Sequence, residues 1–100
     1  MMQTMLSIDL VASDSQVRGG RPCIAGTGIR VTDVVMANLF HRRQPDEIAA
    51  DYELSLAQVY AALSYYYEHK VGLDADIRVQ VELARSLKEQ GVGRQGSLLS

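Results

Sequence analysis

The sequence predicts a mainly helical fold, in which a trihelical helix-turn-helix core follows short N-terminal strands and precedes a C-terminal helix. The chain has 100 residues, 47% hydrophobic and 22% charged, which suits one soluble domain with one modest core. Half of its eight glycines fall between residues 19 and 28, which indicates tight turns between short strands. From residue 31 onward, apolar residues recur every three or four positions, as on one face of a helix.

The first third of the chain is expected to form a β-arm. Apolar and more polar residues alternate over residues 6–12, which is the period of a half-buried strand. Pro22 opens a second apolar segment at residues 23–25, and an extended run resumes at residue 29. Cys23 lies in that second segment, where it is interpreted as a small buried hydrophobe. It is the single cysteine, so no internal disulfide forms and a reducing cytoplasm is expected.

The next two helices are short. Thr32 is expected to cap a helix whose apolar face begins at Val31 and Val34. Arg42 and Arg43 follow its end, where cations suit the carbonyl pole. Pro45 suits the first position of a second helix over about residues 45–51, which carries acidic residues in its first turn.

A third helix is predicted from a capping box and a periodic apolar face. Ser55 and Gln58 have the spacing at which each side chain satisfies a free backbone donor of the other residue. The expected core face consists of Leu56, Val59, Tyr60, Leu63 and Tyr67. One or both of Tyr65 and Tyr66 should then lie outside, because three consecutive residues cannot share one face.

A fourth helix is expected to begin after residues 71–73, capped by Asp74 or Asp76, and to end near Gln90. The last ten residues hold three glycines and are expected to be mobile. The chain thus divides into residues 1–70, the β-arm and trihelical part, and residues 71–100. This second part is either a piece of the same domain or a partner-binding extension.

No residue pattern predicts catalysis. Neither histidine has another ligand at helical spacing, and the glycine-rich stretch lacks the Gly-Lys-Ser/Thr ending of a phosphate loop. We therefore expect no enzyme, no metal and no cofactor. No targeting signal and no apolar run of about 18 residues is found, so no membrane association is expected.

Residues 45–67 follow helix-turn-helix spacing, which favours either a purely structural trihelical core or a DNA-binding one. In the second case the third helix would present Ser55 and Gln58 to the major groove, where Gln58 could read an adenine. Phosphate contacts would come from Arg30, Arg42 and Arg43. The net charge of −2 neither indicates nor forbids such binding.

Protein contacts are expected at two places. An exposed Tyr65 or Tyr66 would be a suitable interface anchor. The candidate residues on the fourth helix are Ile77, Arg78, Val81, Arg85, Leu87 and Lys88. A homodimer is also expected, because a second copy would cover the open strand edge near the N-terminus or the apolar stripe of the fourth helix.

Residues 19–31 read Gly-Gly-Arg-Pro-Cys-Ile-Ala-Gly-Thr-Gly-Ile-Arg-Val, and Asp33-Val34 follow. With Pro45-Asp46-Glu47-Ile48 and residues 59–65, this segment resembles the signature of the domain of unknown function 433 family. The resemblance covers about residues 5–70. Gly28 stands where that family usually has arginine.

The resemblance implies a homeodomain-like, VapB-like antitoxin of a prokaryotic type II toxin–antitoxin system. Such a protein neutralises a PIN-like ribonuclease toxin through its C-terminal segment and uses its N-terminal module for dimerisation or operator DNA. The alternative is a dimeric interaction module that binds no DNA.

Overall fold

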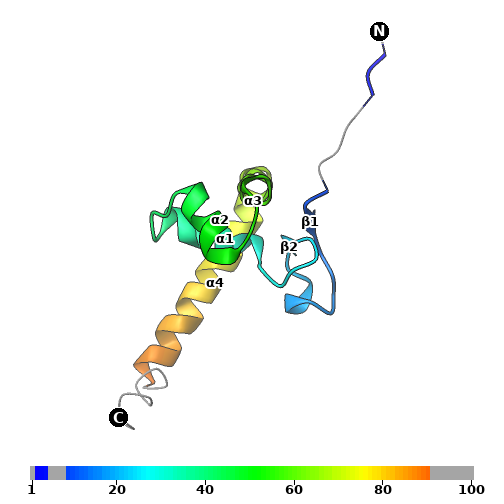
Figure 1. Ribbon diagram of the computed structural model, residues 1–100. Coiled ribbons are helices and arrows are strands. Elements are labelled where there is room, and N and C mark those ends of the chain that lie inside the picture. The colour runs from blue at the N-terminus through cyan, green and yellow to red at the C-terminus, as the bar shows by residue number, and fades with distance from the viewer. Residues whose placement is uncertain (1, 5–8, 91–100) are drawn as a thin grey trace. The chain divides into compact units, whose positions relative to one another are not determined.

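A computed structural model describes residues 2–4 and 9–90 of the chain (Figure 1). Its elements are β1 (Val11–Ala12), the 3-10 helix η1 (Arg18–Gly20), β2 (Cys23–Ile24), α1 (Val31–Leu39), α2 (Pro45–Tyr52), α3 (Leu56–Glu68) and α4 (Lys70–Glu89). The mainly helical fold with an N-terminal hairpin and a long C-terminal helix is therefore confirmed. The chain divides into two compact units, Met1–His69 and Lys70–Ser100, and each is described by itself below.

The two strands form a short antiparallel hairpin, with Val11 opposite Ile24 and Ala12 opposite Cys23. Arg30 adds a single bridge to Cys23 on the other side of β2. The second expected strand is confirmed, whereas the first covers only residues 11–12, and residues 6–8 of its expected span lie outside the described part. In the turn between the strands, Gly19 and Gly20 have φ angles of 67° and 83°, which side chains with a Cβ atom rarely adopt.

Helix α1 begins at Val31 with Arg30 as its N-cap, so the expectation that Thr32 caps it was wrong. The carboxylate of Asp33 accepts the backbone N–H of Arg30 at 2.9 Å, which satisfies a donor that the helix itself leaves unpaired. Thr32 is buried, with 2% of its surface exposed. The helix start is thus capped by the side chain of Asp33, the third helical residue, which accepts a hydrogen bond from the N-cap backbone. No serine or threonine is needed at the N-cap.

The helix-turn-helix segment matches the sequence prediction closely. Helix α2 begins at Pro45 and ends at Tyr52, and Glu53 then adopts a left-handed conformation (φ 57°) that turns the chain. The capping box of α3 is confirmed. The backbone N–H of Gln58 donates to Ser55 Oγ at 3.1 Å, and that of Ser55 donates to Gln58 Oε1 at 2.8 Å.

The inner face of α3 differs from the expected one. Val59, Ala62 and Tyr66 are buried, whereas Tyr60 and Tyr67 are 56% and 59% exposed. Val59 belongs to both the predicted and the observed set, but the rest of the buried face is turned by about one residue, to Ala62 and Tyr66. The error arose because Tyr65, Tyr66 and Tyr67 offer three candidates in a row, and hydropathy cannot rank them.

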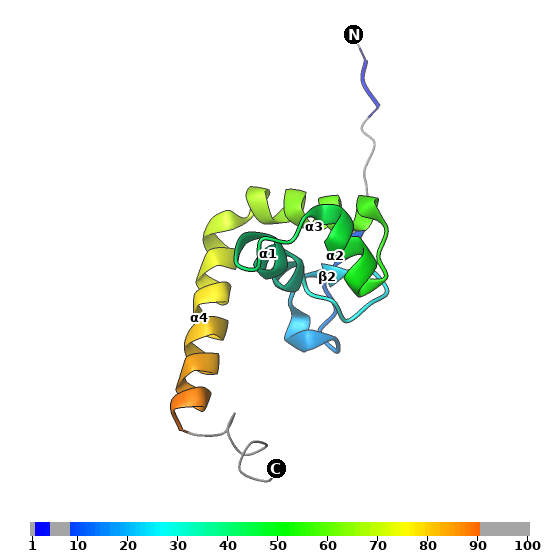
Figure 2. The ribbon, with the colours of Figure 1, turned by 60° about the vertical axis from the view of Figure 1, so that its left-hand side comes forward.

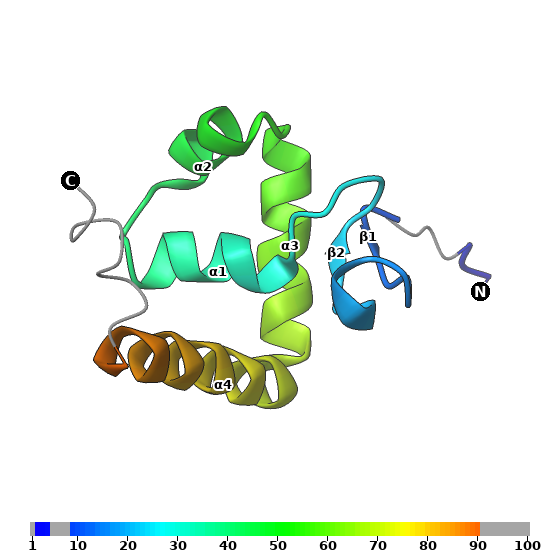
Figure 3. The same cartoon turned by 90° about the horizontal axis from the view of Figure 1, so that it is seen from below.

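Helix α3 is the centre of the first unit. It packs against α1, α2 and the hairpin, and Figures 1 and 3 show α2 and the hairpin on opposite sides of it. Figure 2 shows α1 and α2 close beside α3. The most deeply buried large side chains are Ile24, Val31, Val34, Val35, Ile48 and Val59. They come from β2 and all three helices, so the trihelical core and the hairpin share one interior.

Helix α4, taken by itself, starts earlier than the sequence suggested. Residues 71–73 lie inside it, and neither Asp74 nor Asp76 is its cap. Instead, Lys70 Nζ donates to Asp74 Oδ2 at 2.7 Å, one helical turn away. A glycine inside a helix costs only about 1 kcal/mol relative to alanine, so Gly72 does not end it. No helix in the described ranges is long and apolar enough to cross a membrane.

Candidate functional site

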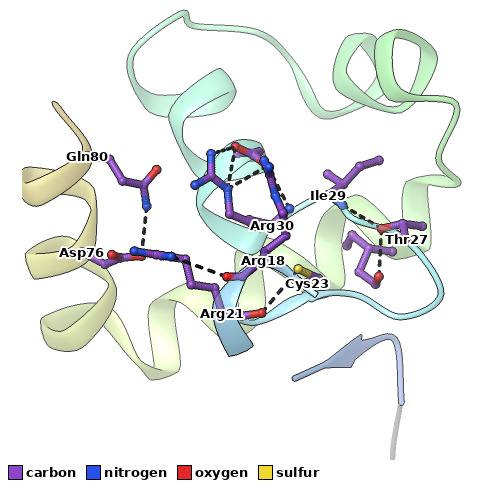
Figure 4. A network of polar contacts seen from close by, with 10 residues as sticks. Arg18, Arg21, Cys23, Thr27, Ile29, Arg30, Asp76 and Gln80 are labelled. Atoms are coloured by element: carbon purple, nitrogen blue, oxygen red, sulfur yellow. Dashed lines mark hydrogen bonds and ion pairs between the residues drawn. The ribbon is translucent and has the colours of Figure 1, made fainter. Parts of the chain in front are cut away.

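The start of α1 carries a cluster of charged side chains, in which Arg18 and Arg30, both labelled in Figure 4, contact the carboxylate of Asp33. The guanidinium of Arg30 grips this carboxylate, with Nη2 at 2.7 Å from Oδ1 and Nε at 3.2 Å from both oxygens. Arg18 Nη2 lies 3.7 Å from Asp33 Oδ2, within ion-pair distance but beyond a hydrogen bond. Arg30, which was predicted to contact phosphate, is therefore first of all a structural partner of Asp33.

These contacts change the acidity of Asp33. Burial raises its pKa, but the hydrogen bonds from the side chain and backbone of Arg30 and the charges of Arg30 and Arg18 outweigh burial. The pKa of Asp33 is thereby held below its ordinary value. A carboxyl whose pKa is lower in the folded than in the unfolded chain stabilises the fold at neutral pH and loses that contribution in acid.

We expect Asp33→Asn to lower the free energy of unfolding at pH 7 by about 1 kcal/mol, which is typical of a lost cap. The difference from the wild type should be complete above the unfolded Asp pKa of about 3.9 and should shrink as pH falls through the lower pKa of the folded state. Urea unfolding from pH 7 downward measures it. Glu89→Gln, at the exposed end of α4, is the control and should shift the free energy by less than about 0.5 kcal/mol. A difference between Asp33→Asn and the wild type that is the same at every pH would contradict this assignment.

Arg42 and Arg43 lie in the loop between α1 and α2, and the structure gives them different roles. Arg43 Nε donates to Asp51 Oδ2 at 3.1 Å, and its Nη1 lies 3.3 Å from Glu47 Oε2. The hydrogen bond and charge of Asp51, with the charge of Glu47, raise the pKa of Arg43. Arg42 is exposed, adopts a left-handed backbone (φ 54°), and has no ion-pair partner within the described ranges. Of the two, Arg42 is the one whose charge is available to an anion.

Ser55 and Gln58 sit at the first turn of α3, where a groove-reading helix would place them. Reading adenine requires both the carbonyl and the amide group of a glutamine. Gln58 Oε1 already accepts the backbone N–H of Ser55, so base reading by Gln58 would break half of the capping box. Their role in DNA binding stays a prediction, and the structure gives both residues a clear role in the helix itself.

The helix-turn-helix segment is acidic. Residues 44–69 contain five acidic residues and no lysine or arginine. The exposed face of α3 adds three large apolar side chains, Leu56, Tyr60 and Tyr67, which are 47%, 56% and 59% exposed. The excess of acidic residues between Gln44 and His69 is visible in the sequence itself. The second feature required knowing which face of α3 is buried.

The two tyrosines proposed as interface anchors are already engaged. The ring of Tyr65 stacks on His69 at a centroid distance of 4.1 Å, and His69 Nδ1 lies 3.0 Å from the Tyr65 carbonyl oxygen. Tyr66 is buried, so of the two tyrosines of which one or both were expected outside, only Tyr65 is partly exposed. The exposed tyrosine of this run is Tyr67, which meets Tyr66 edge to face at 5.0 Å.

The remaining candidates all lie on α4. Arg85 Nη1 is 3.3 Å from Glu82 Oε1, and both side chains are more than half exposed. Such an exposed pair contributes little to stability, so it does not prevent Arg85 from contacting a partner. Arg78 and Lys88 are also exposed. Ile77 is buried at 5% exposure, so it offers no surface to a partner, whereas Val81 is half-buried and Leu87 is 41% exposed.

The described residues hold no group of three or more potential metal ligands. Cys23 is buried at 4% exposure, and burial raises the pKa of its thiol against the opposing charge of Arg18. A cavity of about 440 Å³ beside β2 reaches from Ala12 to Gly28 and is lined mostly by apolar groups. At Gly28 a Cβ atom would meet nothing within 4 Å, so this position has room for a larger side chain.

Comparison with known protein families matches residues 11–66 to the family described as "Protein of unknown function (DUF433)". The matched region covers both strands, α1, α2 and most of α3, and it stops before α4. Searches of curated proteins and of solved structures find no match.

Proposed function

The chain belongs to the DUF433 family, and on this premise we propose that it is a type II antitoxin that neutralises its toxin by protein contact through α4. One observation carries the proposal. The family match ends at residue 66 and the first compact unit ends at His69, so α4 is an extra unit beyond the family domain. An addition of this kind suits a dedicated binding element.

The chemistry of α4 fits a protein partner. It is a helix of 20 residues, and most of the stability of a helix in a protein comes from packing of its apolar face. Val79, Leu83 and Leu87 are 61%, 59% and 41% exposed and follow one another at intervals of four residues, so they supply such a face. Amphipathic helices bind partner grooves in this way. Arg78, Arg85 and Lys88 supply cations that suit the carboxylates of a metal-dependent nuclease site. The PIN-like class of the partner follows from the family resemblance described above.

The first unit, in this proposal, serves assembly more than base reading. Five acidic residues between Gln44 and His69 would oppose the phosphates of a groove, and Arg43 is neutralised by Asp51. Within the described part of the hairpin, β1 pairs only with β2, so one edge of β1 is open to a second copy. Sedimentation equilibrium of the full chain should then report a dimer rather than an 11.0 kDa particle.

The test uses the ribonuclease encoded beside the gene for this chain, purified with it after co-expression. The double substitution Arg78→Glu with Arg85→Glu should weaken the complex at least about tenfold, roughly 1.4 kcal/mol, and restore cleavage of an RNA substrate. Charge reversal at exposed sites of a helix leaves the fold intact, which circular dichroism checks. Ser86→Ala is the matched control on the same helix and should leave inhibition unchanged. A neighbouring gene that encodes no nuclease, or full inhibition by the double variant, would refute this function.

A further inference from the structure

We propose that the outer face of α3 binds a cationic amphipathic helix of another protein. The face is a row of four apolar side chains, called the outer stripe below: Leu56, Tyr60, Leu63 and Tyr67. These residues belong to the first unit and include none of α4, so the binding does not depend on the toxin contact proposed above.

The outer stripe is an apolar surface that is largely in contact with solvent. Leu56, Tyr60 and Tyr67 are 47%, 56% and 59% exposed, and Leu63 is half-buried. The four residues follow one another at intervals of four, three and four positions, which places them along one side of the helix. Two helices that pair along an apolar seam use the same spacing. The stripe thus has the pattern of a buried helix face, which is why the sequence predicted it to face the core.

The exposed surface of α3 also lacks charge. Residues 56–67 contain no acidic and no basic residue, whereas the outer side of a surface helix usually carries charged residues. The small residues Ala57, Ala61 and Ser64 neighbour the stripe in the helical register, and small side chains let a second helix approach closely. Tyrosine is enriched among the residues that contribute most to protein interfaces. This surface therefore suits a helical segment of a protein and offers no cation to a nucleic acid.

Acidic residues at both ends of α3 indicate the charge of the partner. Glu53 lies three residues before Leu56, and Glu68 follows Tyr67 directly. Both carboxylates are exposed, and neither has an ion-pair partner within residues 2–4 and 9–90. Opposite charges across an interface favour association and like charges disfavour it. The partner helix should therefore carry lysine or arginine toward both ends of its apolar side. A second copy of α3 would instead bring carboxylates toward carboxylates.

The probe is a fluorescent synthetic helix of about 18 residues, with leucines at the spacing of the stripe and lysines at both ends. One control peptide has glutamates in place of the lysines. The other has the composition of the lysine peptide, with its leucines moved off a common face. Each is titrated with the full chain, and fluorescence anisotropy reports binding. We expect the lysine peptide to bind at least about tenfold more tightly than either control.

Substitutions in the full chain locate the contact. Tyr60→Gln removes an exposed ring from the middle of the stripe and should weaken binding of the lysine peptide at least about tenfold. Val79→Gln is the matched control, at an apolar side chain of α4 that is 61% exposed, and should change nothing. Glu53→Gln together with Glu68→Gln should weaken binding about threefold at low salt and make it less dependent on salt. Circular dichroism checks that each variant is folded.

Equal binding of the lysine peptide and either control peptide would overturn the proposal, and so would unchanged binding by Tyr60→Gln. An equal loss with Val79→Gln would assign the contact to α4 and reject the outer stripe. Sedimentation equilibrium tests the other occupant. A wild-type dimer that Tyr60→Gln converts to a monomer would assign the stripe to a second copy and reject the cationic helix. No nuclease is present in these measurements, so their outcome is separate from that of the toxin contact.

Discussion

Replacing Ile48 by alanine is expected to lower the free energy of unfolding by about 3 kcal/mol, within the usual range for removing a buried isoleucine side chain. Helix α2 has only eight residues and buries only Ile48 and Ala49. Ile48 is fully buried, so its side chain supplies most of the apolar contact that holds this helix. The cavity left by alanine adds to the lost transfer free energy.

Urea unfolding measures this effect, and Leu56→Ala is the matched control on the neighbouring helix. Leu56 is 47% exposed, so its truncation should cost less than about 1 kcal/mol. Equal costs at the two positions would mean that α2 is not anchored through Ile48. Because the trihelical core has one shared interior, the Ile48 variant should unfold in a single transition at lower urea concentration.

Local signals in the sequence predicted the helix-turn-helix segment well. Pro45 at the first helical position and the reciprocal pair Ser55 and Gln58 act within four residues, and the structure has both as expected. The start of α1 was mispredicted although its signal is also local. The acceptor is the carboxylate of Asp33, the third helical residue, and not a side chain at the cap position. The start of α4 was mispredicted because Gly72 was expected to end the preceding helix, although one glycine destabilises a helix by only about 1 kcal/mol relative to alanine.

The candidate site depended more on tertiary contacts, which the sequence does not display. Arg43 is separated by eight residues from Asp51, and only the packing of the loop against α2 brings them together. Arg18 and Asp33 lie fifteen positions apart and meet because the hairpin folds back toward α1. The residue types therefore predicted that arginines would contact an anion. Which of these arginines are paired with a carboxylate of the chain itself depends on the fold.

Removal of residues 70–100 has the largest expected effect on function. The first unit should remain folded, because the six most deeply buried large side chains come from β2, α1, α2 and α3, although Leu73 and Ile77 of the removed helix are buried as well. The truncated chain should retain a cooperative thermal transition and the helical circular dichroism signal of three helices. It should lose the partner contact entirely if α4 is the toxin-binding element.

The decisive measurement is the affinity of the neighbouring ribonuclease for the full chain and for residues 1–69, by calorimetric titration with RNA cleavage as a second readout. We expect a folded 1–69 chain to bind the ribonuclease at least about 100-fold more weakly, roughly 3 kcal/mol, and no longer to inhibit cleavage. Full inhibition by residues 1–69 would place the contact in the first unit. Aggregation of that fragment would show that α4 belongs to the core. Either result would contradict the assignment of toxin binding to α4.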